Sequence, residues 1–525
     1  MSDDLQRPAV QPTNRSNDFV AETSAMSAQA RWGVYLLLIA MAVGNMTGRL
    51  LSVNSVDKIQ LESTRIKERL AAKQKEIEAE GVSGEQLQAR LSVEAARLRD
   101  DLRLQRPFLS ANDRSRWMTI RSLVERGKYE IDDIVGQPTW DTIDMVQHRG
   151  RDGELHLYSS KPPLLATILA GEYWLINRFS GATLRDHPYE IGRTMLLVSN
   201  ILPLGLMYVL LARLVDRFGT TDWGRIFVMA CATFGTFLNT FAIVLNNHIF
   251  AAVSATITIY LLVQISGAGE RRWWYFFVIG LSAAFTAANE LPAATLLAFT
   301  GLILLWRAPR QTVLWGLPGV AIVAAAFFGT NWIAHGRILP PYAFRSDSDP
   351  QDNWYAYTYT VKGREIKSYW LDRQGIDRGE PSKAMYAVHT LIGHHGVFSL
   401  TPIWILSFVG AVAWLVSADW QRRELAMLML AISVICLMFF IGMRPLEDRN
   451  YGGMTSGFRW LFWCAPLWLI VMIPAADWLS ASVGRQALGA ALLSFSVLSV
   501  SYPAWNPWVH PWLYNWFSWC GWIAT

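Results

Sequence analysis

The sequence has little charge for its length and few cysteines. Charged residues make up 17% of its 525 residues, whereas soluble proteins carry about a quarter. The four cysteines, Cys231, Cys436, Cys464 and Cys520, lie in apolar stretches or in the tail, and none are spaced as metal ligands. The shortage of cysteine excludes a disulfide framework and a zinc-finger type of site. The shortage of charge argues against an ordinary soluble domain.

Strong basicity and nucleic-acid motifs are also missing. The net charge is +5, and no motif of a nucleic-acid-binding fold is present. Basic loops on the cytoplasmic side of a membrane account for this balance. We therefore expect no nucleic-acid partner.

Long apolar stretches dominate what is present. Hydrophobic residues make up 52% of the chain, and there are 25 tryptophans, many of them at the ends of apolar stretches, where indole rings favour a membrane interface. A helix needs about 20 apolar residues to cross a bilayer. The sequence thus predicts an all-α polytopic membrane protein. The candidate stretches are 32–53, 162–178, 191–213, 225–245, 249–267, 273–289, 291–306, 313–334, 396–416, 425–443, 459–479 and 486–503.

The positions of arginine predict the orientation of these helices. Short loops rich in Lys and Arg stay in the cytoplasm. Five turns qualify, namely 213–225, 270–272, 307–310, 421–423 and the turn at Arg485. Placing all five inside leaves the loops 246–248, 335–395 and 444–458, together with the tail, outside.

The same rule applied from the N-terminus conflicts with twelve crossings. If 32–53 runs from inside to outside, a further crossing at 162–178 would give every later helix the direction opposite to the one that the basic turns require. This stretch begins with Pro162-Pro163, contains Glu172 and has only 17 residues, so we interpret it as a helix that lies at the outer interface. About 11 transmembrane helices then remain. An outside N-terminus, with twelve crossings and 54–160 in the cytoplasm, is the alternative.

The chain divides into a membrane bundle and water-exposed inserts. Residues 54–106 repeat apolar side chains at heptad-like spacing on either side of Gly81–Gly84, which predicts a helical hairpin or short coiled coil. A surface helix follows, with Ser110 or Asn112 as its N-cap and Gly127 as its stop. The expected segments are a disordered cytoplasmic leader (1–31), a first transmembrane helix that is an uncleaved signal anchor (32–53), the extracytoplasmic hairpin (54–106), a first outer loop with surface helices (107–190), a transmembrane bundle (191–334), a second large outer loop (335–395), C-terminal transmembrane helices (396–503) and a Trp-rich interfacial tail (504–525).

Four polar clusters fall on the outer side near the membrane, at 112–116, 140–144, 158–164 and 448–459. The third cluster contains Lys161-Pro162-Pro163-Leu164 at the entry to the interfacial helix. An Asp-led surface helix, then this run, then a polytopic bundle resembles the GT-C superfamily of membrane glycosyltransferases, which includes protein O-mannosyltransferases and the aminoarabinose transferases that modify lipid A. The resemblance covers roughly residues 107–460.

This resemblance implies a fold and an activity. Members of the superfamily carry two surface helices in the first outer loop and a second large outer loop after the seventh span, where the orientation above puts 335–395. They transfer a sugar from a polyprenyl-phosphate carrier to an acceptor at the outer face. The implied partners are the lipid bilayer, a polyprenyl-phosphate sugar and a glycan, lipid or protein acceptor. The implied location is the cell (inner) membrane, with the active site on the extracytoplasmic side.

Three aspartates are candidates for catalysis. Asp113 stands close to where the superfamily's catalytic acid precedes its surface helix, and an acid there would take the proton of the acceptor hydroxyl. An N-cap role explains Asp113 as well. Asp141 and Asp144 lie three residues apart. In one interpretation both side chains face one pocket, where either could be the base, a metal ligand or a contact to the acceptor. In the other they belong to a solvated loop.

Three cations are candidates for holding the donor phosphate. Lys161 precedes two prolines that fix the backbone where the chain meets the membrane, although lysines there also reach lipid headgroups in general. Arg193 and Arg459 stand at the outer ends of spans, against the positive-inside tendency, so they require an anionic partner. A lipid phosphate would serve, because arginine can bind it through two hydrogen bonds. Internal pairs with Glu190 and Asp448 would serve equally.

Five further residues are candidate substrate contacts, namely Arg116, His394, His395, Arg449 and Tyr451. Adjacent histidines on a helix point to different faces, so we expect no shared metal at His394 and His395. His248 lies near an outer turn where several relatives carry an acidic residue, which weakens the case for a metal-dependent mechanism. Glu290, at another outer turn, either orients substrate or belongs to a capped hairpin. We expect no metal site and no cofactor, with a divalent metal left open.

The favoured function is transfer of a glycosyl group from a polyprenyl-phosphate sugar, with Asp113 as base and Lys161, Arg193 and Arg459 on the phosphate. One alternative is a flippase or other transporter of lipid-linked glycans, which predicts charged residues in mid-span. The candidate spans contain almost none, which counts against ion-coupled transport. The other alternative is a non-catalytic scaffold that binds a partner through 54–106.

Overall fold

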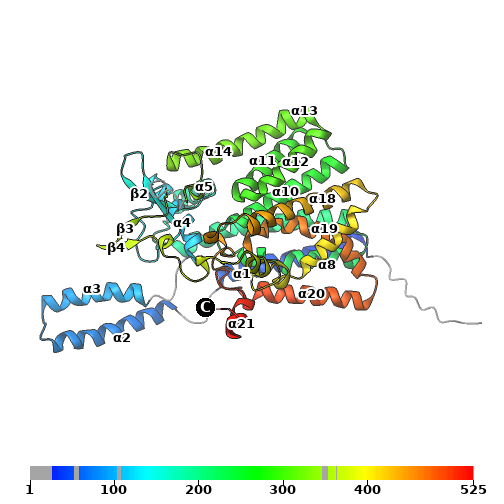
Figure 1. Cartoon of the computed structure of the whole chain (residues 1–525). Coiled ribbons are helices and arrows are strands. Elements are labelled where there is room, and N and C mark those ends of the chain that lie inside the picture. The colour runs from blue at the N-terminus through cyan, green and yellow to red at the C-terminus, as the bar shows by residue number, and fades with distance from the viewer. Residues whose placement is uncertain (1–25, 53–57, 103–107, 346–352, 362, 524–525) are drawn as a thin grey trace, which may run out of the picture.

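The computed structural model describes residues 26–52, 58–102, 108–345, 353–361 and 363–523, and this part of the chain is mostly helical. Helices of similar direction pack side by side into a bundle, from which a two-helix hairpin projects (Figure 1). Two short antiparallel sheets of two strands each accompany the helices.

Seven helices of the described residues are long and apolar enough to cross a membrane. Three of them contain a π-helical turn (η1, η3 and η7). The seven are α1 (Ala28–Leu51), α6–η1–α7 (Pro188–Leu196, Leu197–Ile201, Leu202–Phe218), α10 (Asn247–Gly267), α13–η3–α14 (Pro309–Gln311, Thr312–Gly316, Leu317–His335), α18–η7 (Trp420–Leu437, Met438–Gly442), η9–α19 (Arg459–Cys464, Ala465–Leu479) and α20 (Val483–Ser501). The chain is therefore a membrane protein by the length and composition of its helices.

The expected count of about eleven spans is not confirmed, because four of the predicted stretches form shorter helices. In the first of these stretches, α8 (Asp222–Phe234) ends at Gly235 after 13 residues, and the short α9 (Phe237–Phe241) follows. The others are α11 (Trp273–Asn289), the pair η2–α12 (Leu291–Ala293, Ala294–Arg307) and the pair α16–α17 (Val397–Leu400, Ile403–Leu415). Residues 162–178, which we expected to lie at the interface, fall within α5 (Pro163–Ser180), and α5 is not among the seven.

Glycines allow neighbouring helices to approach closely in the bundle. A side chain at Gly280 of α11 would meet the carbonyl of Gly316, and one at Gly319 of α14 would meet that of Phe277. Gly410 of α17 lies in the same way against Val471 of α19. Small residues at such contacts are typical of membrane helices, because helices in lipid associate through close backbone packing.

One end of the bundle, which we call the basic-loop end, carries the five arginine-containing turns. Its charges are paired. Arg31 at the start of α1 binds Asp216 at 2.6 Å and Asp222 at 2.9 Å, on either side of the turn between α7 and α8. Arg307 at the end of α12 pairs with Glu424 of α18. These pairs join segments that are far apart in the sequence.

The opposite end, which we call the α4 end, carries α4 (Ala111–Arg126), α5 and the strands β1 (Met145–Arg149) and β2 (Leu155–Ser159), on the left in Figure 1. Ser110 caps α4 by accepting from the amide of Asp113 at 3.2 Å, and Gly127 ends the helix in the left-handed conformation. Both boundaries are as the sequence predicts. β1 and β2 pair from Met145 opposite Ser159 to Arg149 opposite Leu155.

The remaining elements also gather at the α4 end. They include the second hairpin, β3 (Thr358–Val361) with β4 (Arg364–Lys367). The short helices are η4 (Pro341–Phe344), η5 (Tyr369–Leu371), η6 (Gly375–Arg378), α15 (Lys383–Leu391), η8 (Leu446–Asp448) and α21 (Trp512–Trp519). The two β-hairpins correct the prediction of an all-α chain. Its apolar periodicity pointed to helices, and these hairpins lie in the polar loops between them.

Residues 54–106 contain two helices, α2 (Lys58–Ala79) and α3 (Glu85–Asp101), which lie side by side and extend beyond the α4 end (Figure 1). Gly81 and Gly84 adopt positive φ angles in the turn between them. Ile77 and Leu91 are buried, while most of the surrounding side chains are exposed. Residues 1–25 of the expected leader (1–31), as well as 53–57 and 103–107, lie outside the described residues. The end of that leader is helical instead of disordered, because Ser27 caps α1 and the helix begins at Ala28.

Candidate functional site

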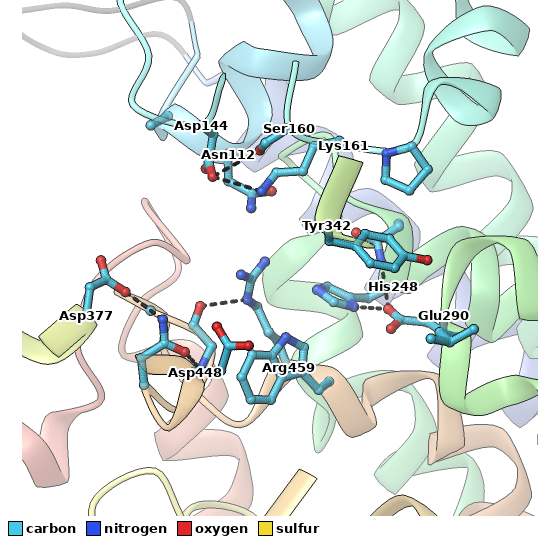
Figure 2. A pocket seen from close by; sticks show the side chains of 18 of the residues that line it. Asn112, Asp144, Ser160, Lys161, His248, Glu290, Tyr342, Asp377, Asp448 and Arg459 are labelled. Atoms are coloured by element: carbon cyan, nitrogen blue, oxygen red, sulfur yellow. Dashed lines mark hydrogen bonds and ion pairs between the residues drawn. The ribbon is translucent and has the colours of Figure 1, made fainter. Parts of the chain in front are cut away.

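A cavity of about 760 Å³ opens at the α4 end. Its wall is assembled from segments that are remote in the sequence, and Figure 2 shows ten labelled side chains around it. The lining residues are drawn from nine segments of the chain, and not every residue of a segment takes part. The segments are 109–116, 143–144, 160–165, 247–248, 288–292, 342–345, 355, 369–377 and 439–460, to which Trp508 is added. The cavity is therefore a product of the tertiary fold and not of any single loop.

Three cations and one aspartate form the polar side of the cavity, with Arg116 and Asp144 buried and Lys161 and Arg459 partly buried. Lys161 Nζ lies 2.9 Å from Asp144 Oδ1. Arg116 donates to the side chains of Asn112 at 2.6 Å and Asn247 at 2.7 Å. Arg459 Nε donates to the Gly452 carbonyl at 3.0 Å, and the guanidinium lies 5.0 Å from the centre of the Trp508 ring. We call Arg116, Lys161 and Arg459 the cation cluster.

The electrostatics of the cation cluster show an excess of positive charge. Burial and, to a smaller extent, nearby Arg459 lower the pKa of the Arg116 guanidinium to about 10, against the attraction of Asp144. Burial also lowers the pKa of Lys161 below its ordinary value, against the attraction of Asp144. Burial alone would raise the pKa of Asp144, but Lys161, Arg459 and Arg116 outweigh it, so that the pKa lies below its ordinary value. Buried like charges close together require an anionic partner.

Local backbone structure positions these groups. Lys161 immediately precedes Pro162 and Pro163, which begin α5, and its amide donates to Ser159 Oγ at 3.2 Å. Pro at the first helical position is favourable because its missing N–H would have no partner there. Gly452 has a φ of 100° and packs directly against the Arg459 side chain. A Cβ at that glycine would be both strained and crowded.

The other side of the cavity is apolar and reaches its rim. Leu164 and Leu165 of α5 line it, as do Phe440 and Met443 at the end of η7. Leu291 and Met443 also line the cavity, and they remain 56% and 74% exposed. An exposed apolar rim at the end of membrane-crossing helices is suited to a lipid chain. The cavity thus offers a cationic side and an apolar side to one ligand.

The structure brings four of the sequence-predicted residues to the cavity and leaves the rest outside its lining. Arg116, Asp144, Lys161 and Arg459 line it. Asp113, Asp141, Arg193, His394, His395, Arg449 and Tyr451 do not. The first group contains one residue from each of the four outer clusters that the sequence indicated. The positions of the second group have specific physical causes.

Asp113 is occupied by the start of α4. Its carboxylate accepts from the amides of Ser110 at 2.9 Å and Leu109 at 3.3 Å, so that Ser110 and Asp113 form a reciprocal capping box. Burial raises the pKa of Asp113 to about 6. Asp141 is exposed, and Arg114 Nη2 lies 4.0 Å from its Oδ2. The N-cap is Ser110, and Asp113 is the third residue of α4 in the capping box, which corrects the N-cap role that the sequence left open for Asp113 itself.

The predicted contacts Arg193 and Arg449 lie away from the cavity. Arg193, in the last turn of α6, places its guanidinium 5.6 Å from the centre of the Tyr189 ring. Arg449 donates to the carbonyls of Pro381 at 2.9 Å and of Glu380 and Arg444 at 3.2 Å. Arg449 thus ties its own loop to the segment before α15 instead of facing a ligand.

His394, His395 and Tyr451 belong to a buried aromatic cluster with His389 and His510. The ring of His395 stacks on Tyr451 with centres 5.1 Å apart, and His389 stacks on His394 at 4.0 Å. Burial lowers the pKa of His394 to about 3. We call these four histidines the histidine cluster, and its rings are packed against one another instead of against the cavity.

The cavity lining contains a second group of polar residues, His248, Glu290 and Asn247, which the sequence analysis did not place among the site residues. His248 Nδ1 is hydrogen-bonded to Glu290 Oε1, which also accepts from Asn247 Nδ2 at 2.7 Å. Residues 247–248 begin α10 and Glu290 follows α11, so both segments read as ordinary helix ends in the sequence. Two polar residues at adjacent turns of one helical hairpin were the available signal.

A further pair of arginines lies near the mouth of the cavity. Arg345 Nη1 binds Asp448 Oδ1 at 2.7 Å, and Arg444 Nη1 lies 3.6 Å from Asp448 Oδ2. The Arg444 guanidinium lies 4.1 Å from the centre of the Trp460 ring. Asp448 is thus bound by these two arginines, and in the described part of the chain it forms no ion pair with Arg459, the partner that the sequence left open for it.

The donor set shows no metal centre in the described part of the chain. No group of three or more His, Cys, Asp or Glu side chains there is arranged to hold a metal ion. The four cysteines are free.

Comparisons with known proteins return no relative. No family model, no curated protein and no solved structure matches the chain.

Proposed function

We propose that the chain is a membrane glycosyltransferase that moves a sugar from a polyprenyl-phosphate donor to an extracytoplasmic acceptor. The observation that carries this proposal is the juxtaposition, in one cavity, of the cation cluster with an apolar rim. A polyprenyl-phosphate sugar has the matching chemistry, because its phosphate is anionic, its chain is apolar and its sugar is polar. Donors of this kind are anchored in the membrane, where such a cavity opens.

The cation cluster has a role in both binding and chemistry. Arg116, Lys161 and Arg459 hold the phosphate in the ground state. As the bond between the sugar and the phosphate breaks, the phosphate gains negative charge, and these cations stabilise it. The leaving group of the reaction is thus the part of the donor that the site binds most firmly.

The proposal includes an orientation. The five arginine-containing turns lie in the cytoplasm, as the positive-inside tendency requires. The α4 end then faces the extracytoplasmic side, with about eleven helices crossing the membrane if the shorter helices also cross. The cell (inner) membrane is the corresponding location, and the acceptor is a glycan, lipid or protein that reaches the cavity from outside the cell.

Ligand binding to the purified full chain tests the proposal. Native mass spectrometry in detergent should detect a bound long-chain polyprenyl phosphate and a much weaker signal for the matching polyprenol, which lacks the phosphate. Arg459→Gln should weaken phosphate-lipid binding, while the control Arg178→Gln, on the exposed end of α5, should not. Equal binding of the two lipids, or of the phosphate lipid to both variants, would contradict the proposal.

A further inference from the structure

A histidine–glutamate pair in the cavity wall is separate from the cation cluster. His248 in the first turn of α10 is 2% exposed, and Glu290 after α11 is 6% exposed. The two side chains are hydrogen-bonded to each other, and both line the cavity. Figure 2 shows His248 between Glu290 and Arg459. The ring therefore borders the space in which the donor phosphate is proposed to bind.

The carboxylate determines which nitrogen of His248 carries the proton. An ionised carboxylate only accepts hydrogen bonds, so Nδ1 must donate its proton to Glu290. Nε2 is then left with a lone pair, and it is buried without a hydrogen-bond partner among the described residues, so that an incoming hydroxyl would have to reach it from the cavity that the ring borders. A neutral imidazole that is held in one tautomer by a carboxylate is the arrangement that enzymes use to remove a proton from a nucleophile.

A chain of hydrogen bonds joins this pair to the cation cluster. Arg116 Nη2 donates to Asn247 Oδ1 at 2.7 Å, and Asn247 Nδ2 donates to Glu290 Oε1 at 2.7 Å. Glu290 Oε1 in turn accepts from His248. One side of the network therefore contacts the proposed phosphate site, and the other side ends at an imidazole nitrogen that is able to accept a proton.

We propose that His248 is the general base of the transfer reaction and that Glu290 is its positioning residue. This inference rests on the proposed function and assigns to His248 the role that the sequence suggested for Asp113. Asp113 is not in the cavity lining, and its carboxylate is held by the capping box, whereas His248 lines the cavity with a free lone pair.

The transfer of the sugar can be written with His248, Glu290, the cation cluster and water as the participating groups. His248 Nε2 takes the proton of an acceptor hydroxyl, and the hydroxyl oxygen forms a bond to the anomeric carbon of the donor sugar. The bond between that carbon and the phosphate oxygen breaks, and its electron pair leaves with the lipid phosphate, which the cation cluster stabilises. The imidazolium then loses its extra proton to water. Glu290 stabilises the positive ring while it exists.

The protonation state of His248 can be tested without any knowledge of the sugar. NMR of the full chain, labelled at histidine and reconstituted in lipid nanodiscs, can be assigned for this residue by comparison with His248→Gln. We expect a neutral ring at neutral pH, with its proton on Nδ1. A ring that carries its proton on Nε2, or that stays positively charged above neutral pH, would overturn the proposal.

Turnover separates this inference from the proposed function. The probe is a polyprenyl-phosphate hexose, with water as the slow acceptor and release of free sugar as the signal. His248→Gln should bind polyprenyl phosphate as the unchanged chain does. Its rate of sugar release should be lower by a factor of at least about 10². It should also lose the decline in rate at acidic pH. The rate of sugar release by Glu290→Gln should lie between the rates of the unchanged chain and of His248→Gln. The matched control is His156→Gln, on β2 outside the cavity, which should keep the rate of the unchanged chain.

Each outcome decides one of the two proposals. If His248→Gln keeps the rate and pH profile of the unchanged chain, His248 is not the base, although the transferase proposal stands. If the unchanged chain neither binds polyprenyl phosphate nor releases sugar, the transferase proposal fails and this inference fails with it. Addition of free imidazole to His248→Ala should restore part of the rate, which a purely structural role would not predict.

Discussion

The two ends of the helix bundle use arginine in different ways. At the basic-loop end, Arg31 and Arg307 each bind carboxylates from other helices. At the α4 end, Arg116 donates to amide side chains and a main-chain carbonyl, and Arg459 donates to a carbonyl. Among the described residues, Arg116 and Arg459 form no ion pair with a carboxylate, unlike Arg31 and Arg307 and also unlike Arg345 and Arg444 at their own end, which bind Asp448. Arg31 and Arg307 therefore stabilise the fold, whereas Arg116 and Arg459 are available to bind an anionic ligand.

Arg307→Gln should have the largest effect on stability, because it leaves the buried Glu424 carboxylate without its partner. Breaking a buried ion pair on one side costs about 3–5 kcal/mol. Unfolding of the purified chain by heat or denaturant measures this change. Arg310→Gln, an exposed neighbour on the same turn, is the control. Equal unfolding midpoints for the two variants would remove the contrast between the ends.

Arg459→Gln should behave in the opposite way at the α4 end. Removing one of several crowded cations should leave the unfolding midpoint unchanged or raise it. Binding of polyprenyl phosphate should weaken by about 1.5–3 kcal/mol, which is the usual contribution of a charge-assisted hydrogen bond. Native mass spectrometry or a thermal-shift titration with this lipid provides the measurement. A strong loss of stability with unchanged binding would mean that Arg459 has the same structural role as Arg307.

Acid should loosen the α4 end through the histidine cluster. Burial lowers the pKa of His389, His394, His395 and His510 below the ordinary value of 6.5. Only the unfolded chain is protonated as the pH falls below about 6.5, so stability is complete above that pH and is lost as the pH falls toward the folded-state values. For His394, with a pKa of about 3, the loss at about pH 5 is about 2 kcal/mol.

Hydrogen exchange by mass spectrometry at about pH 7 and about pH 5, corrected for the intrinsic exchange rate, locates this loss. Faster corrected exchange should begin in α15 and α21, next to the histidine cluster, and not at the basic-loop end. Glu380 lies near His389 and Asp377 near His510, and both carboxylates oppose the effect by favouring protonation. Uniform loosening of both ends would contradict the assignment.

Asp113→Ala should have the smallest effect. It removes the capping box of α4, which is worth about 1 kcal/mol. Asp113→Asn should change sugar release from a polyprenyl-phosphate hexose very little, because the carboxylate lies outside the cavity lining. A rate that collapses in Asp113→Asn while the unfolding midpoint is kept would restore Asp113 as the base and refute the role of His248.

Local elements could be predicted where a local pattern specifies them. Ser110 and Gly127 bound α4 as expected, because capping depends on a few neighbouring residues. The helices α2 and α3 lie on either side of Gly81–Gly84. The hairpin of β1 and β2 was missed, although Gly150 and Gly153 supply a turn and the second strand alternates apolar and polar residues.

The cavity could be predicted only in part, because its assembly depends on contacts between distant segments. Charge reasoning about the outer loops found Lys161, Asp144 and Arg459, which do line one cavity. It could not foresee that Asp113 would turn back to its own helix start. Nor could it pair His248 with Glu290, because the packing of α10 against α11 decides that contact.

The length of the hairpin of α2 and α3 can be compared with the thickness of a membrane. With 22 residues, α2 is about 33 Å long at 1.5 Å per residue. This is close to the thickness of the apolar layer of a bilayer, about 30 Å. The hairpin runs onward from the α4 end in roughly the direction of the bundle helices (Figure 1). The hairpin itself is therefore about as long as the apolar layer of a bilayer is thick, and a structure that binds along it would meet a helical surface of that length.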